Sequence, residues 1–148
     1  DIPTRPLTTI LFAEAASQFD PLTRDGIEEG LNSWPAIFRR SEFIPAVDYI
    51  RALRIRRRLQ ERMQELMSEI DFFVSSGGDE LLITNMTGHP SIAMPSGFVE
   101  NGDSIQPQSI QFVGRLFDEV TILNAARAFQ QETDYHLRRP PLVSKQQD

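Results

Sequence analysis

Two histidines are the residues whose type best suits a general base in this sequence. A serine nucleophile needs an oriented imidazole beside it, and His89 and His136 are the two that the chain offers. His89 precedes Pro90 at a predicted strand entry, and His136 follows Asp134 and Tyr135 at a predicted helix end. A histidine at the C-terminal end of a helix is more often a favourable contact with the helix dipole than a base. The spacing therefore indicates no Ser-His-Asp arrangement.

Metal and thiol chemistry have little support in the residue pattern. The chain has no cysteine, which excludes a thiolate nucleophile, a disulfide framework and a Cys-type zinc site. The two histidines are 47 positions apart. The carboxylate pairs Asp79-Glu80 and Asp118-Glu119 fall at predicted turns, where acidic residues are common. We therefore predict no metal and no cofactor.

Arginine is concentrated in one segment, which could contact nucleic acid. Six arginines fall within twelve positions, and four of them are spaced three or four residues apart and so share one helix face. Glutamates are interleaved at the C-terminal end of this run, which favours a solvated face over a phosphate-binding one. RNA or acidic-protein binding through helix 51–62 remains the alternative. The arginines are Arg51, Arg54, Arg56, Arg57, Arg58 and Arg62, and the glutamates are Glu61, Glu65 and Glu69.

Length and composition predict a soluble, globular protein. The 148 residues are 40% apolar and carry a net charge of −6, which argues against a general attraction to nucleic acid or anionic membranes. No apolar stretch approaches the roughly 20 residues of a transmembrane helix, and the first residues do not resemble a signal peptide. We predict a single domain over residues 1–139, a polar tail over residues 140–148 and a cytoplasmic location.

The first half of the chain reads as helical. Apolar residues at three-and-four spacing predict a helix over residues 7–19, and Asp25-Gly26 then marks a turn. A weaker helix is expected over residues 27–38, interrupted by Pro35 because proline lacks a backbone donor. The strongest pattern is a long amphipathic helix that begins at Ser41 or Pro45 and runs to Ile70.

The second half changes to strand periodicity. Short strands are predicted over residues 71–75, 91–94 and 109–113, with a polar hairpin or loop over residues 100–108. A last amphipathic helix begins at Asp118 and fades near Thr133. Three strands and four helices predict a layered α/β protein, in which three strands are few for so much flanking helix.

Several segments resemble the C-terminal half of the amidase signature family. The most specific run over residues 84–98, with Gly88-His89-Pro90 at the centre, and over residues 110–123, with Gly114-Arg115 at the centre. Residues 12–16 and 43–50 are similar to the same half. The resemblance implies an α/β/α fold, of which this chain would be the C-terminal part, with a few-stranded mixed sheet flanked by helices. That explains the small number of strands.

The resemblance implies amide hydrolysis by residues that this chain does not supply. The family uses a serine nucleophile, a second serine and a lysine base, set in a Gly/Ser-rich segment upstream of the region that the chain resembles. A lysine base must be neutral and sheltered, but the one lysine here, Lys145, follows a double proline in a polar tail. Ser75-Ser76 imitates part of the nucleophile segment, yet it follows Phe-Phe-Val and reads as a strand exit into a loop. We therefore predict no catalytic residue.

Three residues are the candidates for a substrate pocket wall. Ligands of layered α/β proteins collect at strand ends, so the polar segment 84–88, expected to be a loop before a strand, is the best local candidate. Asn85 and Thr87 can hydrogen-bond an amide there, although both can equally satisfy the backbone of a turn. Trp34 can line an apolar wall, although core packing is the commoner role.

Three functional hypotheses follow from the sequence. The first is a C-terminal portion of an amidase, or of the A subunit of a glutamyl-tRNA amidotransferase, that is inactive alone but forms part of the pocket for a small amide in the intact enzyme. The second is an interaction module that uses the arginine-rich helix, and the third is a complete small hydrolase. The first predicts an upstream Gly/Ser-rich segment with a lysine before it. It also predicts self-association, because a sheet without its neighbouring strands exposes edges and apolar helix faces.

Overall fold

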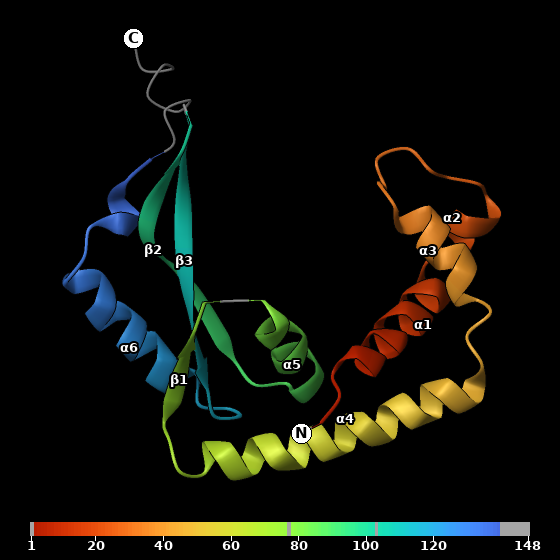
Figure 1. Ribbon diagram of the computed structural model, residues 1–148, viewed down its shortest axis with the longest axis horizontal. Coiled ribbons are helices and arrows are strands. Elements are labelled where there is room, and N and C mark those ends of the chain that lie inside the picture. Colours follow the sequence, from red (N-terminus) through yellow and green to blue (C-terminus); the bar gives the residue numbers. More distant parts are fainter. Residues whose placement is uncertain (1, 77, 103, 140–148) are drawn as a thin grey trace. The chain divides into compact units, whose positions relative to one another are not determined.

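The computed structural model describes residues 2–76, 78–102 and 104–139, and the predicted tail over residues 140–148 lies outside them. The chain divides into two compact units, residues 1–63 and residues 64–148 (Figure 1). Compactness does not test whether each unit folds independently, so the single domain over residues 1–139 stays a prediction. Among the described residues, no helix combines the length and apolar character needed to cross a membrane.

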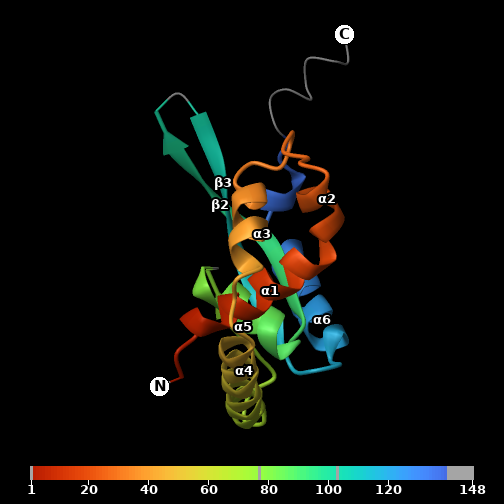
Figure 2. The same ribbon diagram turned by 90° about the vertical axis from the view of Figure 1, so that its right-hand side faces the viewer.

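The first unit is built from short helices at its N-terminal end. A 3-10 turn, Arg5–Leu7, leads into α1 (Thr8–Gln18), which confirms the helix predicted over residues 7–19. Helix α2 (Asp20–Arg24) follows directly with Pro21 in its first turn, and α3 (Trp34–Ser41) lies against α1 (Figure 2). Their core includes the ring of Phe38, which stacks on Phe19 with ring centroids 5.2 Å apart.

The second helix of the first unit differs from its prediction. Residues 27–33 are turns and extended chain, and α3 begins only at Trp34. Gly30 and Asn32 adopt left-handed backbone angles, with φ of +76° and +50°, which a helix cannot accommodate. Pro35 does not interrupt the helix, because it stands in the first turn, where the missing N–H would have no partner in any case.

The long helix predicted from Ser41 or Pro45 to Ile70 is observed as α4 (Ala46–Met67). It begins directly after Pro45, and its first eighteen residues belong to the first unit and the rest to the second. Its apolar stripe is buried in part: Leu59, Met63 and Met67 have less than one tenth of their surface exposed, whereas Val47 is 56% exposed.

The second unit contains a three-stranded sheet in the order β1-β3-β2. Its strands are β1 (Phe72–Ser75), β2 (Ser91–Asn101) and β3 (Ser104–Gly114), and both pairings are antiparallel. The predicted α/β class, with a few strands flanked by helices, is confirmed. The predicted sheet of mixed parallel and antiparallel pairing is not observed among the described strands. Strands β2 and β3 form an antiparallel hairpin, and β1 also runs opposite to β3. The segment 100–108, predicted as a polar hairpin or loop, mostly continues these two strands.

One face of the sheet carries the core of the second unit. Helix α6 (Glu119–Gln131) packs on β2 and β3 and confirms the last predicted helix (Figure 1). Burial along these strands does not simply alternate, because Phe112, Val113 and Gly114 at the end of β3 are all buried. The buried centre consists of Met94, Phe112, Ile122 and Ala126, with Phe72, Ile92, Ile110, Ala125 and Phe129 packed around it.

Helix α5 (Asp79–Thr87) stands where the sequence predicts a loop. It ends at Gly88, whose φ of +85° is the left-handed conformation that commonly terminates helices. The hydroxyls of Thr84 and Thr87 donate to the carbonyls of Leu81 and Ile83, at 3.1 Å and 2.9 Å. Threonines that bond to their own backbone in this way are compatible with helix and turn alike, so the polar pattern does not distinguish the two.

Candidate functional site

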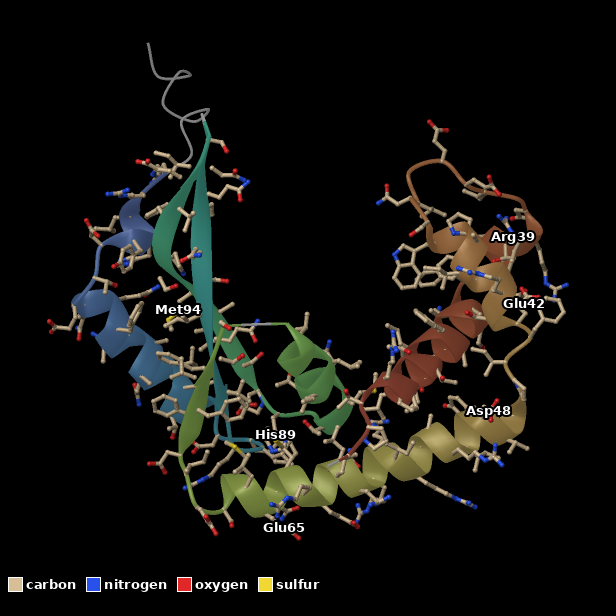
Figure 3. The ribbon with its side chains drawn as sticks, viewed as in Figure 1. Arg39, Glu42, Asp48, Glu65, His89 and Met94 are labelled. Carbon is tan, nitrogen blue, oxygen red and sulfur yellow. The ribbon has the colours of Figure 1, made fainter. Side chains whose placement is uncertain are left out.

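The two family-like segments meet in the second unit, and His89 lies at this junction. Gly88 ends α5, β2 begins at Ser91, and His89 stands between them with 6% of its surface exposed. Figure 3 shows its side chain directed toward the C-terminal part of α4. The backbone N–H of Gly114, at the end of β3, donates to the carbonyl of Pro90 at 3.0 Å, which joins the two segments.

Thr87 fixes which nitrogen of His89 carries the proton. The Thr87 hydroxyl has a single proton, which it donates to the carbonyl of Ile83 at 2.9 Å. The same oxygen lies 2.9 Å from Nδ1 of His89, and here it can only accept. Nδ1 therefore carries the hydrogen and Nε2 is left as an acceptor. Burial lowers the pKa of His89, which keeps the ring neutral.

Arg115 holds the end of α4 beside this histidine. Its Nε donates to the carbonyls of Met67 and Ile70, at 3.1 Å and 2.9 Å, and its Nη2 lies 2.8 Å from Oδ1 of Asp71. The carbonyls in the last turn of a helix have no partner within the helix, so a guanidinium there satisfies groups that would otherwise need water. Arg115 is a structural clamp between the β3–α6 turn and α4.

Gly114 lets α6 approach the sheet closely. A Cβ added at this position would lie 2.7 Å from the Cγ2 atom of Ile122, closer than carbon atoms approach in proteins. Ile122 is in the buried centre under α6. The glycine of the Gly114-Arg115 pair is therefore required by packing, as the arginine is required by the helix end.

A small cavity opens beside His89. Its volume is about 240 Å³, and it lies entirely in the second unit. This volume is below the usual range of roughly 300–1,000 Å³ for ligand pockets, so the cavity admits only a fragment-sized molecule. Its lining residues are Gln64, Met67, Ser68, His89, Arg115 and Leu116.

The predicted pocket residues are not brought together as one polar wall. Asn85 is exposed on α5, whereas Thr87 is buried and occupied by its two hydrogen bonds. The expected loop over residues 84–88 is wrong, because all but Gly88 are helical. Trp34 lies in the first unit, 36% exposed, with its ring 5.5 Å from that of Phe38. Whether these three residues bind an amide stays a prediction.

The other candidates for chemistry lie apart from the cavity. His136 is exposed on a 3-10 turn, Tyr135–Leu137. Ser75 is buried and is the last residue of β1, which agrees with its prediction as the end of a strand. Asp118 accepts a hydrogen bond of 2.8 Å from the Thr121 hydroxyl at the start of α6. Within the described ranges, no three His, Asp or Glu side chains are grouped closely enough to hold a metal ion.

The first unit has a wider and more open hollow, of about 720 Å³, between α1, α3 and the start of α4. Within it the Tyr49 hydroxyl donates to Oε1 of Glu14 at 3.1 Å, and this hydrogen bond raises the pKa of Tyr49. Arg24 and Asp20, also at its edge, form an ion pair of 2.7 Å. These charged groups are satisfied by one another and form no nucleophile and base pair.

The arginine-rich face of α4 is exposed and partly neutralised. Arg51 pairs with Asp48 at 3.2 Å, and Arg57 pairs with Glu61 at 2.9 Å, both on the same helix. Such pairs at three-and-four spacing are typical of a solvated helix surface. Of these two ion pairs, the one between Arg57 and Glu61 uses one of the interleaved glutamates.

Sequence reasoning does not identify His89 and Arg115 as partners in one site. Their signal is present, since both stand in the most family-like segments, each directly after a glycine. The pattern does not reveal that the β2–β3 hairpin brings these two residues, which are 26 positions apart in the sequence, into one site.

Comparison with known proteins gives matches to part of the chain. The A subunit of the glutamyl-tRNA(Gln) amidotransferase of Cupriavidus taiwanensis is 48% identical over 59 residues, which is 40% of this chain and 11% of that protein. A Mycobacterium tuberculosis protein named as an amidase, AmiD, is 47% identical over 58 residues, 39% of this chain and 12% of its own length. The corresponding amidotransferase A subunit of Methanosarcina mazei is 30% identical over 117 residues, 65% of this chain and 24% of its own.

No protein-family profile and no solved structure matches the chain. The matches cover between 11% and 24% of the length of these three relatives. They nevertheless carry the names of one family, and they agree with the resemblance read from residues 84–98 and 110–123. The recognition made from the sequence is confirmed: this chain contains a segment homologous to the C-terminal part of amidase signature family proteins.

Proposed function

We propose that this chain is the C-terminal portion of an amidase signature enzyme and supplies scaffold and pocket wall rather than catalytic groups. The proposal is supported by the structural roles that residues of the family-like segments have in this chain. Gly88 ends a helix, Gly114 admits Ile122, and Arg115 closes the end of α4. Each of these contacts serves the fold, and none pairs a nucleophile with a base.

The proposal includes inactivity of the chain by itself. Hydrolysis of a carboxamide C–N bond by the family's chemistry needs a sheltered, neutral lysine within hydrogen-bond reach of a serine. Lys145 is the one lysine of the sequence, and it lies beyond the described residues in a polar segment after Pro140-Pro141.

The relatives leave two parent activities open, which substrate tests can separate. One is hydrolysis of a small amide, and the other is the role of the A subunit in a glutamine-dependent tRNA amidotransferase. In either case we propose a cytoplasmic enzyme whose small-molecule amide is bound partly by this region, without a membrane partner. In the second unit, Asn85 and Thr87 are the proposed contacts for that amide, and Trp34 in the first unit is proposed separately to line an apolar wall.

A chimera tests the scaffold and wall directly. In the AmiD relative, the segment that aligns with this chain is replaced by the residues of this chain, and ammonia release from a panel of simple carboxamides is measured. We expect the chimera to fold and to retain hydrolysis, with an altered substrate preference. A Gly114→Ala version of the chimera should be less stable to urea, whereas a Gly97→Ala version should not, because a Cβ at Gly97 meets no atom within 4 Å. A folded chimera that releases no ammonia would contradict the proposal.

The second candidate function is RNA binding through the exposed arginine face of α4. Its support is the exposure of Arg51, Arg54, Arg58 and Arg62 on one helix. Filter binding to tRNA over a salt titration tests it, since several phosphate contacts predict a steep loss of affinity with salt. We expect weak binding with a shallow salt dependence, because carboxylates already neutralise part of this face.

A further inference from the structure

The His89 ring presents one unused hydrogen-bonding atom. Nδ1 is bonded to Thr87, and among the described residues no protein group bonds to Nε2. Nε2 is nevertheless not sealed in the interior, because the one buried side-chain atom found without a partner in the described part of the chain is Oε1 of Gln111. His89 lines the cavity of about 240 Å³, so its free acceptor opens onto that cavity.

The rest of the cavity wall decides what kind of molecule fits this acceptor. Met67 is 2% exposed and Leu116 is 39% exposed, and together they supply an apolar wall. The Ser68 hydroxyl donates to the carbonyl of Glu65 at 2.7 Å, so toward the cavity it too can only accept. Arg115 adds a positive charge, which its ion pair with Asp71 balances in part.

These features select by charge and by hydrogen-bonding type. A carboxylate would place acceptor oxygens against the lone pair of Nε2, and a cation would meet the guanidinium of Arg115. A molecule with no N–H or O–H would leave Nε2 without a partner, and an acceptor left unpaired in this way weakens binding. An uncharged donor with an apolar body suits His89, Ser68, Met67 and Leu116, and the amide of Gln64, which also lines the cavity, can accept from or donate to such a molecule.

We propose that this cavity is a binding site for a small neutral hydroxyl compound of the phenol class. The O–H donates to Nε2 of His89, and the ring lies against the thioether of Met67 and the side chain of Leu116. Sulfur–aromatic contacts of this kind are favourable. The site goes beyond the proposed scaffold function, since it needs no amide and no residue outside this chain.

Matched ligands test the proposal on the full chain. The protein is labelled with ¹⁵N-histidine and titrated with phenol, with anisole, which has the same ring but no O–H donor, and with benzoate. Phenol should bind saturably and move the Nε2 resonance of His89 while leaving His136 unchanged. Anisole and benzoate should bind about tenfold more weakly or not at all, the factor expected for one lost hydrogen bond. Equal binding of phenol and anisole, or no saturation by phenol, would overturn the site.

Two variants locate the binding. Leu116→Trp fills the cavity from a position that is already partly exposed, and it should abolish the phenol-dependent shift of His89. Leu137→Trp is the control, because Leu137 is 68% exposed in the same unit and does not line the cavity. If Leu116→Trp does not fold, as circular dichroism would reveal, the comparison of phenol with anisole on the unmodified chain still decides. Loss of hydrolysis in the chimera would not affect this result, so the two proposals fail separately.

Discussion

At the scale of single residues, Gly114, Arg115 and His89 of the family-like segments each make a specific packing or hydrogen-bonding contact. Gly114 is extended backbone, so its requirement is not conformational: a side-chain carbon at this position would approach Cγ2 of Ile122 to 2.7 Å. At His89, one hydroxyl makes two contacts. The Thr87 hydroxyl accepts from Nδ1 of His89, which orients the ring, and donates to the carbonyl of Ile83 in the turn before it. Such contacts explain resemblance to an enzyme family without any catalytic group.

The Gly114→Ala substitution should destabilise the second unit by about 1–3 kcal/mol through overpacking, measured as the free energy of unfolding in urea. Ile122→Leu removes the Cγ2 methyl group, so the double variant should recover part of the loss, and the coupling can be read from a double-mutant cycle. Gly97→Ala is the matched control and should change stability by less than about 0.5 kcal/mol. Equal costs at Gly114 and Gly97 would show that the close approach does not exist.

Protonation of His89 should make stability depend on pH. Its pKa is lowered from an ordinary value of 6.5 by burial, whereas the unfolded chain keeps that ordinary value. Below pH 6.5 the unfolded state therefore binds more protons, so the free energy of unfolding falls as the pH drops toward the lower pKa of the folded state. Urea unfolding at about pH 7.5 and about pH 5.5 measures this.

The two histidines can be separated in that experiment. His89→Gln should remove most of this pH dependence above the range in which carboxylates titrate, and His136→Gln, at an exposed position, should leave it in place. A pH dependence that disappears with His136 instead would place the titrating group elsewhere. If His89→Gln does not fold, the ¹⁵N titration of His89 in the unmodified chain gives the same pKa directly.

At the scale of elements, the helix and strand periods predict most of what is observed, and the failures have physical causes. The long helix and the first and last helices are predictable because their apolar positions repeat over several turns. The three strands are predicted from short apolar runs, and β2 and β3 extend beyond the predicted residues 91–94 and 109–113. Residues 27–33 are not, because the left-handed angles at Gly30 and Asn32 are set by the turn itself. Helix α5 is also not predictable, because nine residues give too few repeats to separate a helix from a polar loop.

The candidate site is less predictable than the elements. The sequence identifies Thr87 as a polar residue before a strand, but it indicates its partner, His89, only as part of the strand entry. The tautomer of His89 depends on the hydrogen bond that Thr87 donates to the carbonyl of Ile83. Ile83 lies four residues before Thr87, so this bond can be expected only once α5 is known to be a helix. The clamp of Arg115 on Met67 spans 48 positions, which no local pattern can reveal.

The clamp at the end of α4 gives a prediction for one element. Arg115→Met keeps the aliphatic stem but removes the donors to Met67 and Ile70, so it should cost about 1–2 kcal/mol of stability and increase amide hydrogen exchange in the last turn of α4. Arg127→Met on the exposed face of α6 is the control and should leave both unchanged. Unaltered exchange at the end of α4 in Arg115→Met would contradict the clamp.

At the scale of the whole molecule, the described residues include exposed apolar side chains and two outer strands of the sheet. Val74 on β1 is 58% exposed, and Val120 on α6 is 67% exposed. Within the described sheet, β1 and β2 are the outer strands. Surfaces of this kind are covered in stable proteins by further strands, further helices or a second copy.

We therefore predict that the isolated chain self-associates. Light scattering over a range of protein concentrations should detect a dimer or larger species. Val74→Lys places a charge on the β1 edge and should shift this equilibrium toward monomer, whereas lysine in place of the exposed Asn85 should not. A monomer at all concentrations would count against association through these surfaces.

We propose that this polypeptide supplies structural parts of an amide-cleaving enzyme and is inactive alone. The most direct measurement is ammonia release from glutamine and from a simple carboxamide by the purified chain, with an intact amidase as the positive control. We expect no release above buffer, and no difference between the unmodified chain and the Ser75→Ala and Ser76→Ala variants. Turnover that copurifies with the chain and is lost in either serine variant would contradict the claim.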